Sequence, residues 1–309
     1  MTTFPIHYRL GLNQPLGTPT QLRTAEMADA INLEADGEFR LDTFPEARLG
    51  LDPQMLADMR AGSLEFYMSG AHLGGLAPAS ALAMLPFAFK DSAAVFAALD
   101  GALGERIRGE LAGHGTYAFP RSWQNGFHHL TTSVRPIREA ADLAGLKIRT
   151  PGGDIAADFF RALGAEPGMI PFNRMYGALQ SRTFDGQSDP LQIVLALCLY
   201  EVQSWLSLMA HWWSGFTLLG NAAAWAALPE RIREIVGRHA EAAALAQRAD
   251  VERVNAAGAE QLARHGMAVN EADTASFRKM LGPFYAQWRE RAGAEAWRLL
   301  ETYAGEIFA

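Results

Sequence analysis

Short apolar runs alternate with segments of helical periodicity through the first seventy residues. The predicted strands are residues 4–12, 39–44 and 64–69, and the predicted helices are residues 18–31 and 52–61. Thr18 followed by Pro19 is typical of a helix N-cap, and Gly62 is expected to end the second helix. Strands that alternate with helices predict βαβ units and a largely parallel sheet.

The same alternation returns in the middle of the chain. The predicted strands are residues 126–132, 146–149, 166–171 and 184–186, and the predicted helices are residues 154–163 and 175–180. We therefore expect two α/β units in tandem, divided near residues 121–126. No internal sequence repeat relates the two units.

The last hundred residues have a different pattern. An Ala-rich run from Leu228 to His265 contains hardly any helix breaker except Gly237 and Gly258, and its apolar residues recur at helical spacing. A helix of about 35 residues is about 50 Å long, which exceeds the width of one small lobe. This helix is therefore expected to contact both α/β units.

Composition narrows the class of protein. The chain has 309 residues, of which 49% are apolar and 20% charged, and this is ordinary globular composition. A formal net charge of −7 with no basic stripe argues against a nucleic-acid-binding protein. Cys198 is the single cysteine, so neither an internal disulfide nor a cysteine metal cluster is expected.

No segment has the pattern of a membrane span or a leader peptide. The most apolar run, Leu191 to Leu199, is too short to cross a bilayer, and Glu201 soon follows it. The first ten residues include His7 and Arg9 and lack the apolar core of a signal peptide. Two interpretations follow: a cytoplasmic protein, or a chain whose leader has been removed.

Motifs for catalysis, nucleotide binding and metal binding are missing from the sequence. It has no phosphate-binding glycine loop, no nucleophile elbow and no metalloprotease signature. His128 and His129 are adjacent, and neighbours on a strand point to opposite faces, so no metal site is expected there. Polar residues do cluster at strand ends, where α/β sheets bind ligands. These residues are Asn13, Arg149 and Asp189, with His128 inside a strand of the second unit.

Many short motifs in order resemble one family. The densest is Asp142-Leu143-Ala144-Gly145-Leu146-Lys147-Ile148-Arg149-Thr150-Pro151. The others include Leu85-Pro86-Phe87-Ala88-Phe89, Gly126-Phe127, Thr132-Ser133 with Arg135-Pro136-Ile137, Tyr176-Gly177-Ala178-Leu179-Gln180, Asp185-Gly186-Gln187 and Tyr200-Glu201-Val202-Gln203. Over nearly its whole length the chain resembles the solute receptors of tripartite ATP-independent periplasmic (TRAP) transporters, the DctP-like family.

The resemblance implies an α/β fold shaped as a two-lobed clamp. Each lobe would hold a mostly parallel sheet with flanking helices, and a long helix would span both. We expect lobe I to comprise residues 1–125 and 214–255, and lobe II residues 126–213 and 256–309. Hinges are expected near residues 121–126 and 212–215.

The resemblance also implies a role. The protein would be a monomeric periplasmic receptor, its leader removed, that binds a small organic solute and delivers it to the small and large membrane subunits. It would perform no chemistry and need no cofactor or metal. An enzyme or a ligand-sensing module on the same scaffold is the alternative.

The family's signature arginine falls on Arg149, where it implies a bidentate pair with a ligand carboxylate. Two positions depart from the family pattern: His128 stands where an arginine is common, and Asp189 where an asparagine is common. Asp189 could neutralise Arg149, bind an amine or hydroxyl of the ligand, or turn away to start the next helix. The solute is accordingly of carboxylate, amino or polyol type. The aromatic residues expected to line the cleft are Tyr67, Trp123, Phe172, Trp212 and Trp213.

Overall fold

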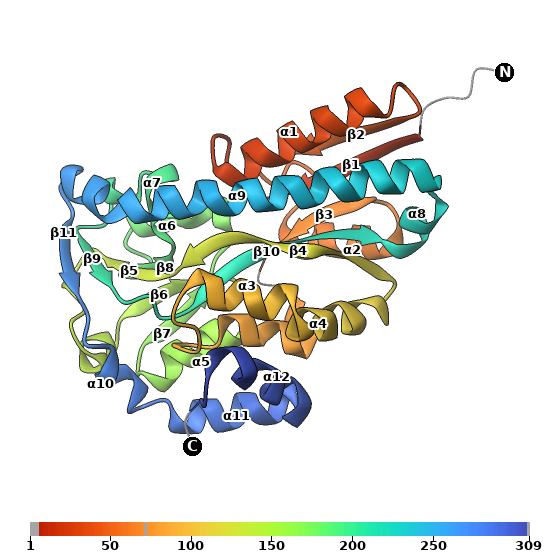
Figure 1. The fold of residues 1–309 in the computed structure, drawn as a ribbon. Helices are drawn as coiled ribbons and strands as arrows, with labels where there is room; N and C mark the ends of the chain where they lie inside the picture. The colour runs from red at the N-terminus through yellow and green to blue at the C-terminus, as the bar shows by residue number, and fades with distance from the viewer. Residues whose placement is uncertain (1–5, 71–72, 308–309) are drawn as a thin grey trace.

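The computed structural model describes residues 6–70 and 73–307 of the chain. Two α/β lobes lie side by side, each built around its own sheet (Figure 1). No helix within this described part is long and apolar enough to cross a membrane.

Lobe I contains a five-stranded sheet in the order β2-β1-β3-β10-β4. Its strands are β1 (Ile6–Leu12), β2 (Phe39–Phe44), β3 (Phe66–Ser69), β4 (Thr116–Phe127) and β10 (Trp213–Asn221). Its helices are α1 (Pro19–Glu34), α2 (Asp52–Ala61), α3 (Ser92–Asp100), α4 (Ala102–Ala112) and α8 (Ala222–Ala227). β1 runs parallel to β2 and β3, whereas β10 runs antiparallel to β3 and β4.

Lobe II contains a six-stranded sheet in the order β11-β9-β5-β8-β6-β7. Its strands are β5 (His129–Thr132), β6 (Lys147–Thr150), β7 (Glu166–Met169), β8 (Gly186–Asp189), β9 (Trp205–Leu208) and β11 (Ala268–Glu271). The nearby helices are α5 (Asp154–Ala162), α6 (Met175–Gln180), α7 (Leu191–Ala196) and α10 (Thr274–Arg278). β5 is antiparallel to β8 and β9, so this sheet, like that of lobe I, is mixed.

The chain passes between the lobes at two neighbouring places. β4 of lobe I leads directly into β5 of lobe II, and the chain returns from β9 to β10 through residues 209–212. The two crossings are joined by backbone hydrogen bonds, since His128 N donates to Trp212 O over 2.8 Å and His211 N donates to His128 O over 3.2 Å. The crossings lie next to the expected hinge regions, residues 121–126 and 212–215, rather than within them.

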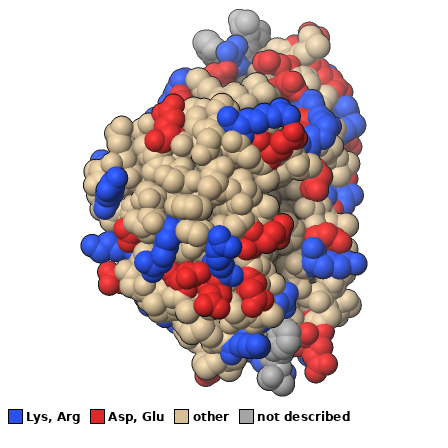
Figure 2. Space-filling model, turned by 90° about the vertical axis from the view of Figure 1, so that its left-hand side faces the viewer, with Lys and Arg blue, Asp and Glu red and all other residues tan. Residues whose placement is uncertain are grey.

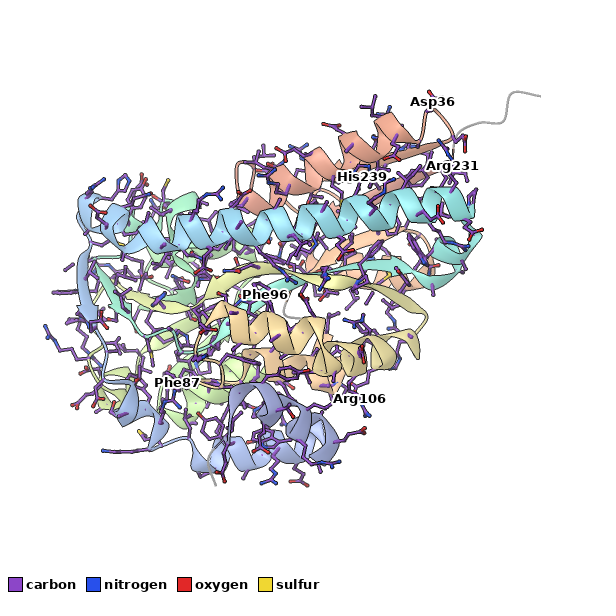
Figure 3. All side chains as sticks on the ribbon, viewed as in Figure 1. Asp36, Phe87, Phe96, Arg106, Arg231 and His239 are labelled. Atoms are coloured by element: carbon purple, nitrogen blue, oxygen red, sulfur yellow. The ribbon has the colours of Figure 1, made fainter. Side chains whose placement is uncertain are left out.

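A single long helix, α9 (Glu230–Arg264), runs along both lobes (Figure 1). It packs on α1 and β4 in lobe I and on α7 and β11 in lobe II. His239 and Arg231 project from α9 toward α1 and the turn after it (Figure 3), where their partners are Glu34 at 2.7 Å and Glu38 at 3.0 Å. This helix confirms the 35-residue length expected from the Ala-rich run.

The C-terminal helices α11 (Gly282–Ala292) and α12 (Ala294–Ala304) fill the space below both lobes. α12 packs on α3 and α4 of lobe I, while α11 packs on α5 of lobe II. The last segment therefore contacts both lobes, and this corrects the expectation that all of residues 256–309 belong to lobe II. A shared apolar core results, in which the ring of Phe159 contacts Phe284 of α11 as well as Phe160 and Trp212.

Several elements begin and end where the sequence indicates. α2 covers residues 52–61 as expected, and Gly62 ends it in the left-handed conformation at φ +80°. Thr18 caps α1 by accepting from the backbone N of Gln21 over 3.4 Å. The expected strand 126–132 is instead the end of β4 and the whole of β5, interrupted at His128. The sequence pattern does not predict the antiparallel strand β10.

The outer end of lobe II has a distinctive surface. Figure 2 shows a broad central area without Lys, Arg, Asp or Glu, bordered by charged side chains of both signs. Strand β11 lies at this end (Figure 1), and its Val269 has an exposed fraction of 38%.

Candidate functional site

A cavity of about 280 Å³ lies between the lobes. Its polar lining comes from both sides: Asn13, Gln14 and Asp52 from lobe I, Arg149, Asn173 and Asp189 from lobe II, and Asn125, His128 and Ser214 from the crossings. Ligand pockets typically range from about 300 to 1,000 Å³, so this cavity suits a small solute.

Arg149 and Asp189 form a buried ion pair in the lobe II wall. β6 and β8 are parallel neighbours with Arg149 opposite Gln187, so Asp189 lies just beyond Arg149 at the same edge of the sheet. Nη1 of Arg149 donates to Oδ2 of Asp189 over 2.9 Å, and only 4% and 5% of the two side chains are exposed. The other side of the guanidinium donates from Nε and Nη2 to the carbonyl of Ile170, over 3.4 and 3.3 Å.

Burial dominates the electrostatics of this pair. It raises the pKa of Asp189 to about 6, and the neighbouring Arg149 partly opposes that shift. Burial also lowers the pKa of Arg149, but an arginine begins so far above neutrality that it stays a cation. The first of the three sequence-based alternatives, Asp189 paired with Arg149, is therefore the arrangement in the structure.

The lobe I wall is built around a carboxylate that the sequence analysis missed. Asp52 begins α2, where Oδ1 accepts from the Tyr67 hydroxyl over 2.6 Å and Oδ2 accepts from Nδ2 of Asn13 over 2.8 Å. Gln14 in turn donates to Oδ1 of Asn13 over 2.9 Å. The available signal was Asp52 before Pro53 at the start of the helix that follows the second strand, near the edge of the sheet where α/β proteins bind ligands.

His128 lies at the first crossing and bonds to both lobes. Nε2 is 2.7 Å from Oγ of Ser214 on β10, and Nδ1 is 3.0 Å from Oγ of Ser188 on β8. Ser188 is also 2.9 Å from Nε2 of His211, while Ser214 accepts from Asn125 over 3.0 Å. Burial holds the pKa of His128 well below its usual value, so the ring is neutral and supplies no positive charge to the cavity.

The structure brings together five of the nine residues proposed from sequence: Asn13, His128, Arg149, Phe172 and Asp189 line the cavity. Tyr67, Trp123 and Trp212 do not line it, because their rings belong to the apolar cores, where they are 0%, 1% and 2% exposed. Trp213 lines a second cavity of about 570 Å³, which adjoins the first along Gly215 and Phe216. The expectation that these four aromatic residues line the ligand cavity is therefore corrected.

The remaining ionisable side chains do not gather into a metal site. Across residues 6–70 and 73–307, no cluster of three or more His, Cys, Asp or Glu could hold a metal ion. Within the cavity lining, the ionisable side chains are Asp52, His128, Arg149 and Asp189. This set can pair with charged or hydroxyl groups of a solute, and its one cation is Arg149.

Comparisons with known proteins place the chain in a family. Residues 10–291 match the family model of the bacterial extracellular solute-binding proteins, family 7 (DctP). The 2,3-diketo-L-gulonate-binding periplasmic protein YiaO of Escherichia coli is 34% identical over 221 residues, which are 71% of this chain and 67% of YiaO.

Solved structures agree over nearly the whole chain. A TRAP periplasmic solute-binding protein from a Polaromonas species, bound to D-erythronate, has a TM-score of 0.91 and 29% identity, covering 97% of this chain and 100% of that one. The sugar acid binding protein DctPAm of Advenella mimigardefordensis, in complex with galactonate, has a TM-score of 0.92 and 27% identity, with coverage of 97% and 98%. The chain therefore belongs to family 7 of the bacterial extracellular solute-binding proteins, and it is a solute receptor of the TRAP type rather than an enzyme.

Proposed function

We propose that this receptor works in the periplasm, where it binds a polyhydroxylated monocarboxylate, a sugar acid, in the 280 Å³ cavity and delivers it to the membrane subunits of a transporter. The observation that carries the proposal is the buried arginine Arg149 in the wall of a cavity lined from both lobes. The charges and hydrogen-bonding groups around it define the class of solute.

Arg149 has the capacity to hold one carboxylate. A guanidinium carries five N–H groups, and Asp189 and Ile170 accept from three of them. Among the described residues, one N–H on Nη1 and one on Nη2 have no acceptor. A carboxylate binds arginine through two such N–H groups, which adds geometric specificity to the charge attraction.

The other charges in the cavity restrict the solute to a single carboxylate. Asp52 and Asp189 are both acidic, and His128 is neutral, so a second carboxylate would meet no cation among the described residues of the lining. Hydroxyl groups fit this lining better, because Asp52, Asn13 and Gln14 offer acceptors and amide donors on the opposite wall. Three of the similar proteins support this choice, because 2,3-diketo-L-gulonate, D-erythronate and galactonate each combine one carboxylate with several hydroxyls, whereas other similar proteins bind succinate or C4-dicarboxylates.

The uncharged surface of lobe II supports docking on a membrane partner. Figure 2 shows that this end of the molecule lacks charged side chains over a broad area, and Val269 is an exposed apolar residue of β11, a strand at this end (Figure 1). Desolvating an uncharged surface requires less free energy than desolvating a charged one. This surface is therefore our candidate for contact with the membrane subunits.

A calorimetric panel tests the solute class. It contains erythronate, galactonate, gluconate, 2,3-diketo-L-gulonate, succinate, the neutral polyol galactitol, and ectoine as a zwitterion. We expect the sugar acids to bind, and the dicarboxylate and the polyol to bind at least about tenfold more weakly, a difference of about 1.4 kcal/mol. A clear preference for succinate, or for galactitol over galactonate, would contradict the proposed class.

A further inference from the structure

The second oxygen of Asp189 is available to the cavity. Oδ2 accepts the hydrogen bond from Arg149, but among the described residues no group donates to Oδ1. The residue lines the cavity although only 5% of its side chain is exposed. A solute carboxylate that reaches Arg149 must therefore lie beside a second, nearly dehydrated carboxylate.

Two carboxylates that share one guanidinium repel each other strongly at such a buried place. In general, when two carboxyl groups share a site, the pKa of one rises because both cannot be ionised together. Burial has already raised the pKa of Asp189 to about 6 before any solute enters. A solute whose carboxylate bonds directly to Arg149 is held as the anion, so the proton would reside on Asp189.

We propose that Asp189 takes up one proton from solvent when a solute carboxylate binds Arg149, so that the carboxylate and the proton enter the cavity together. Protonated Asp189 would then donate a hydrogen bond from Oδ1 to the bound carboxylate. This hydrogen bond would replace the repulsion between two negative charges. The inference rests on the proposed function, because it requires a carboxylate ligand at Arg149.

The surrounding groups offer few other acceptors for this proton. Arg149, on β6, is paired with Asp189 and is already a cation, so it cannot accept the proton. From β5, His129 stands opposite Asp189, but burial lowers its pKa to about 4. His128 and Asp52 line the same cavity, so they are the competing proton acceptors that an experiment must exclude.

Titration calorimetry in several buffers measures the proton directly. At pH 7, galactonate is titrated in buffers that differ in ionisation enthalpy, and the slope of binding enthalpy against that enthalpy gives the protons taken up. Erythronate replaces galactonate if only erythronate binds. We expect close to one proton per ligand, and an affinity that weakens by up to about tenfold per pH unit above pH 7.

Three variants identify the side chain that takes up the proton. Asp189→Asn should bind without proton uptake and with little pH dependence. Asp52→Asn, the matched control in the opposite wall, and His128→Gln should both keep the uptake. Uptake that persists in Asp189→Asn, or disappears in His128→Gln alone, would overturn the assignment to Asp189.

The two proposals fail in different ways. Binding of a sugar acid by the unmodified protein without proton uptake contradicts the proton-coupled mechanism, but it leaves the proposed function intact. If no carboxylate in the panel binds, the proposed function itself is wrong. The proton coupling is then wrong as well, because it requires a bound carboxylate. Uptake that is equal for galactonate and a neutral polyol would also overturn the coupling, since it would not depend on the carboxylate.

Discussion

The side-chain amide of Gln247 pairs with the backbone of Gln124 as though it were a neighbouring strand. The N–H of Gln124 donates to Oε1 over 2.8 Å, and Nε2 donates to the carbonyl of Gln124 over 2.6 Å. Gln247 is fully buried in the middle of α9, and Gln124 lies in β4 close to the first crossing. The pair therefore attaches the long helix to the strand that leads from lobe I to lobe II.

Replacing this amide should destabilise the protein. Gln247→Leu keeps most of the side-chain volume but leaves the N–H and the carbonyl of Gln124 without partners. Each unsatisfied buried group costs about 1–3 kcal/mol, so the free energy of unfolding should fall by about 2–6 kcal/mol in urea denaturation. Gln261→Leu, at an exposed position of the same helix, is the control and should change stability little.

Arg149→Ala should remove ligand binding while the protein still folds. Loss of one partner of a buried ion pair costs about 3–5 kcal/mol, so the dissociation constant for a sugar acid should rise at least about 100-fold. Calorimetry measures the affinity, and circular dichroism checks the fold. Arg161→Ala, at an exposed arginine of α5, should bind normally. Near-normal affinity in Arg149→Ala would show that the Arg149 side chain does not bind the solute.

Asp189→Asn should broaden the range of carboxylates that bind. The asparagine amide can donate a hydrogen bond to a carboxylate, whereas an ionised aspartate repels it. We expect succinate to bind more tightly to the variant than to the unmodified protein at pH 8, where repulsion is greatest. If the unmodified protein already binds succinate tightly, and Asp189→Asn does not change this, then Asp189 does not limit the choice of ligand.

The ligand-free protein should lose stability as the pH rises from about 4 to 6. In the unfolded chain Asp189 releases its proton near pH 4, but in the folded protein it holds the proton until about pH 6. The folded state binds more protons across this window, so its stability falls with rising pH, by up to about 3 kcal/mol.

The stability difference between the unmodified protein and Asp189→Asn isolates this contribution. Chemical denaturation at pH 4, 5, 6 and 7 should show the unmodified protein losing stability relative to the variant, with no further change above pH 7. A constant difference across the series would show that folding does not shift the titration of Asp189.

Ligand binding should bring the two lobes closer together. Among the segments that the structure describes, the chain crosses between the lobes at residues 127–129 and 209–213 and along α9, and the C-terminal helices α11 and α12 also contact both lobes. We expect closure to occur by rotation about residues 127–129 and 209–213. Small-angle scattering with saturating galactonate should give a smaller radius of gyration than the ligand-free protein. An unchanged radius at saturation would contradict closure at these hinges.

Local sequence determined much of the secondary structure. Pro53 in the first turn and Gly62 at the end fix α2, because proline suits a helix start and glycine tolerates the left-handed conformation that ends it. The motif around Arg149 placed it at the end of a strand in a βαβ unit. Parallel neighbouring strands end at one edge of a sheet, so Arg149 and Asp189 could be expected together from the sequence alone.

Only the tertiary structure decided which side chains reach the cavity. Alternation along a strand shows that neighbouring residues face opposite sides, but it does not show which side a helix covers. Tyr67 and Trp123 therefore became core residues, while Asp52, Asn125 and Ser214 line the cavity. The antiparallel place of β10 between β3 and β4 depends on pairing over long sequence separations, which local pattern does not encode. The sequence thus specified the cation and its strand, and the packing of two lobes determined what surrounds it.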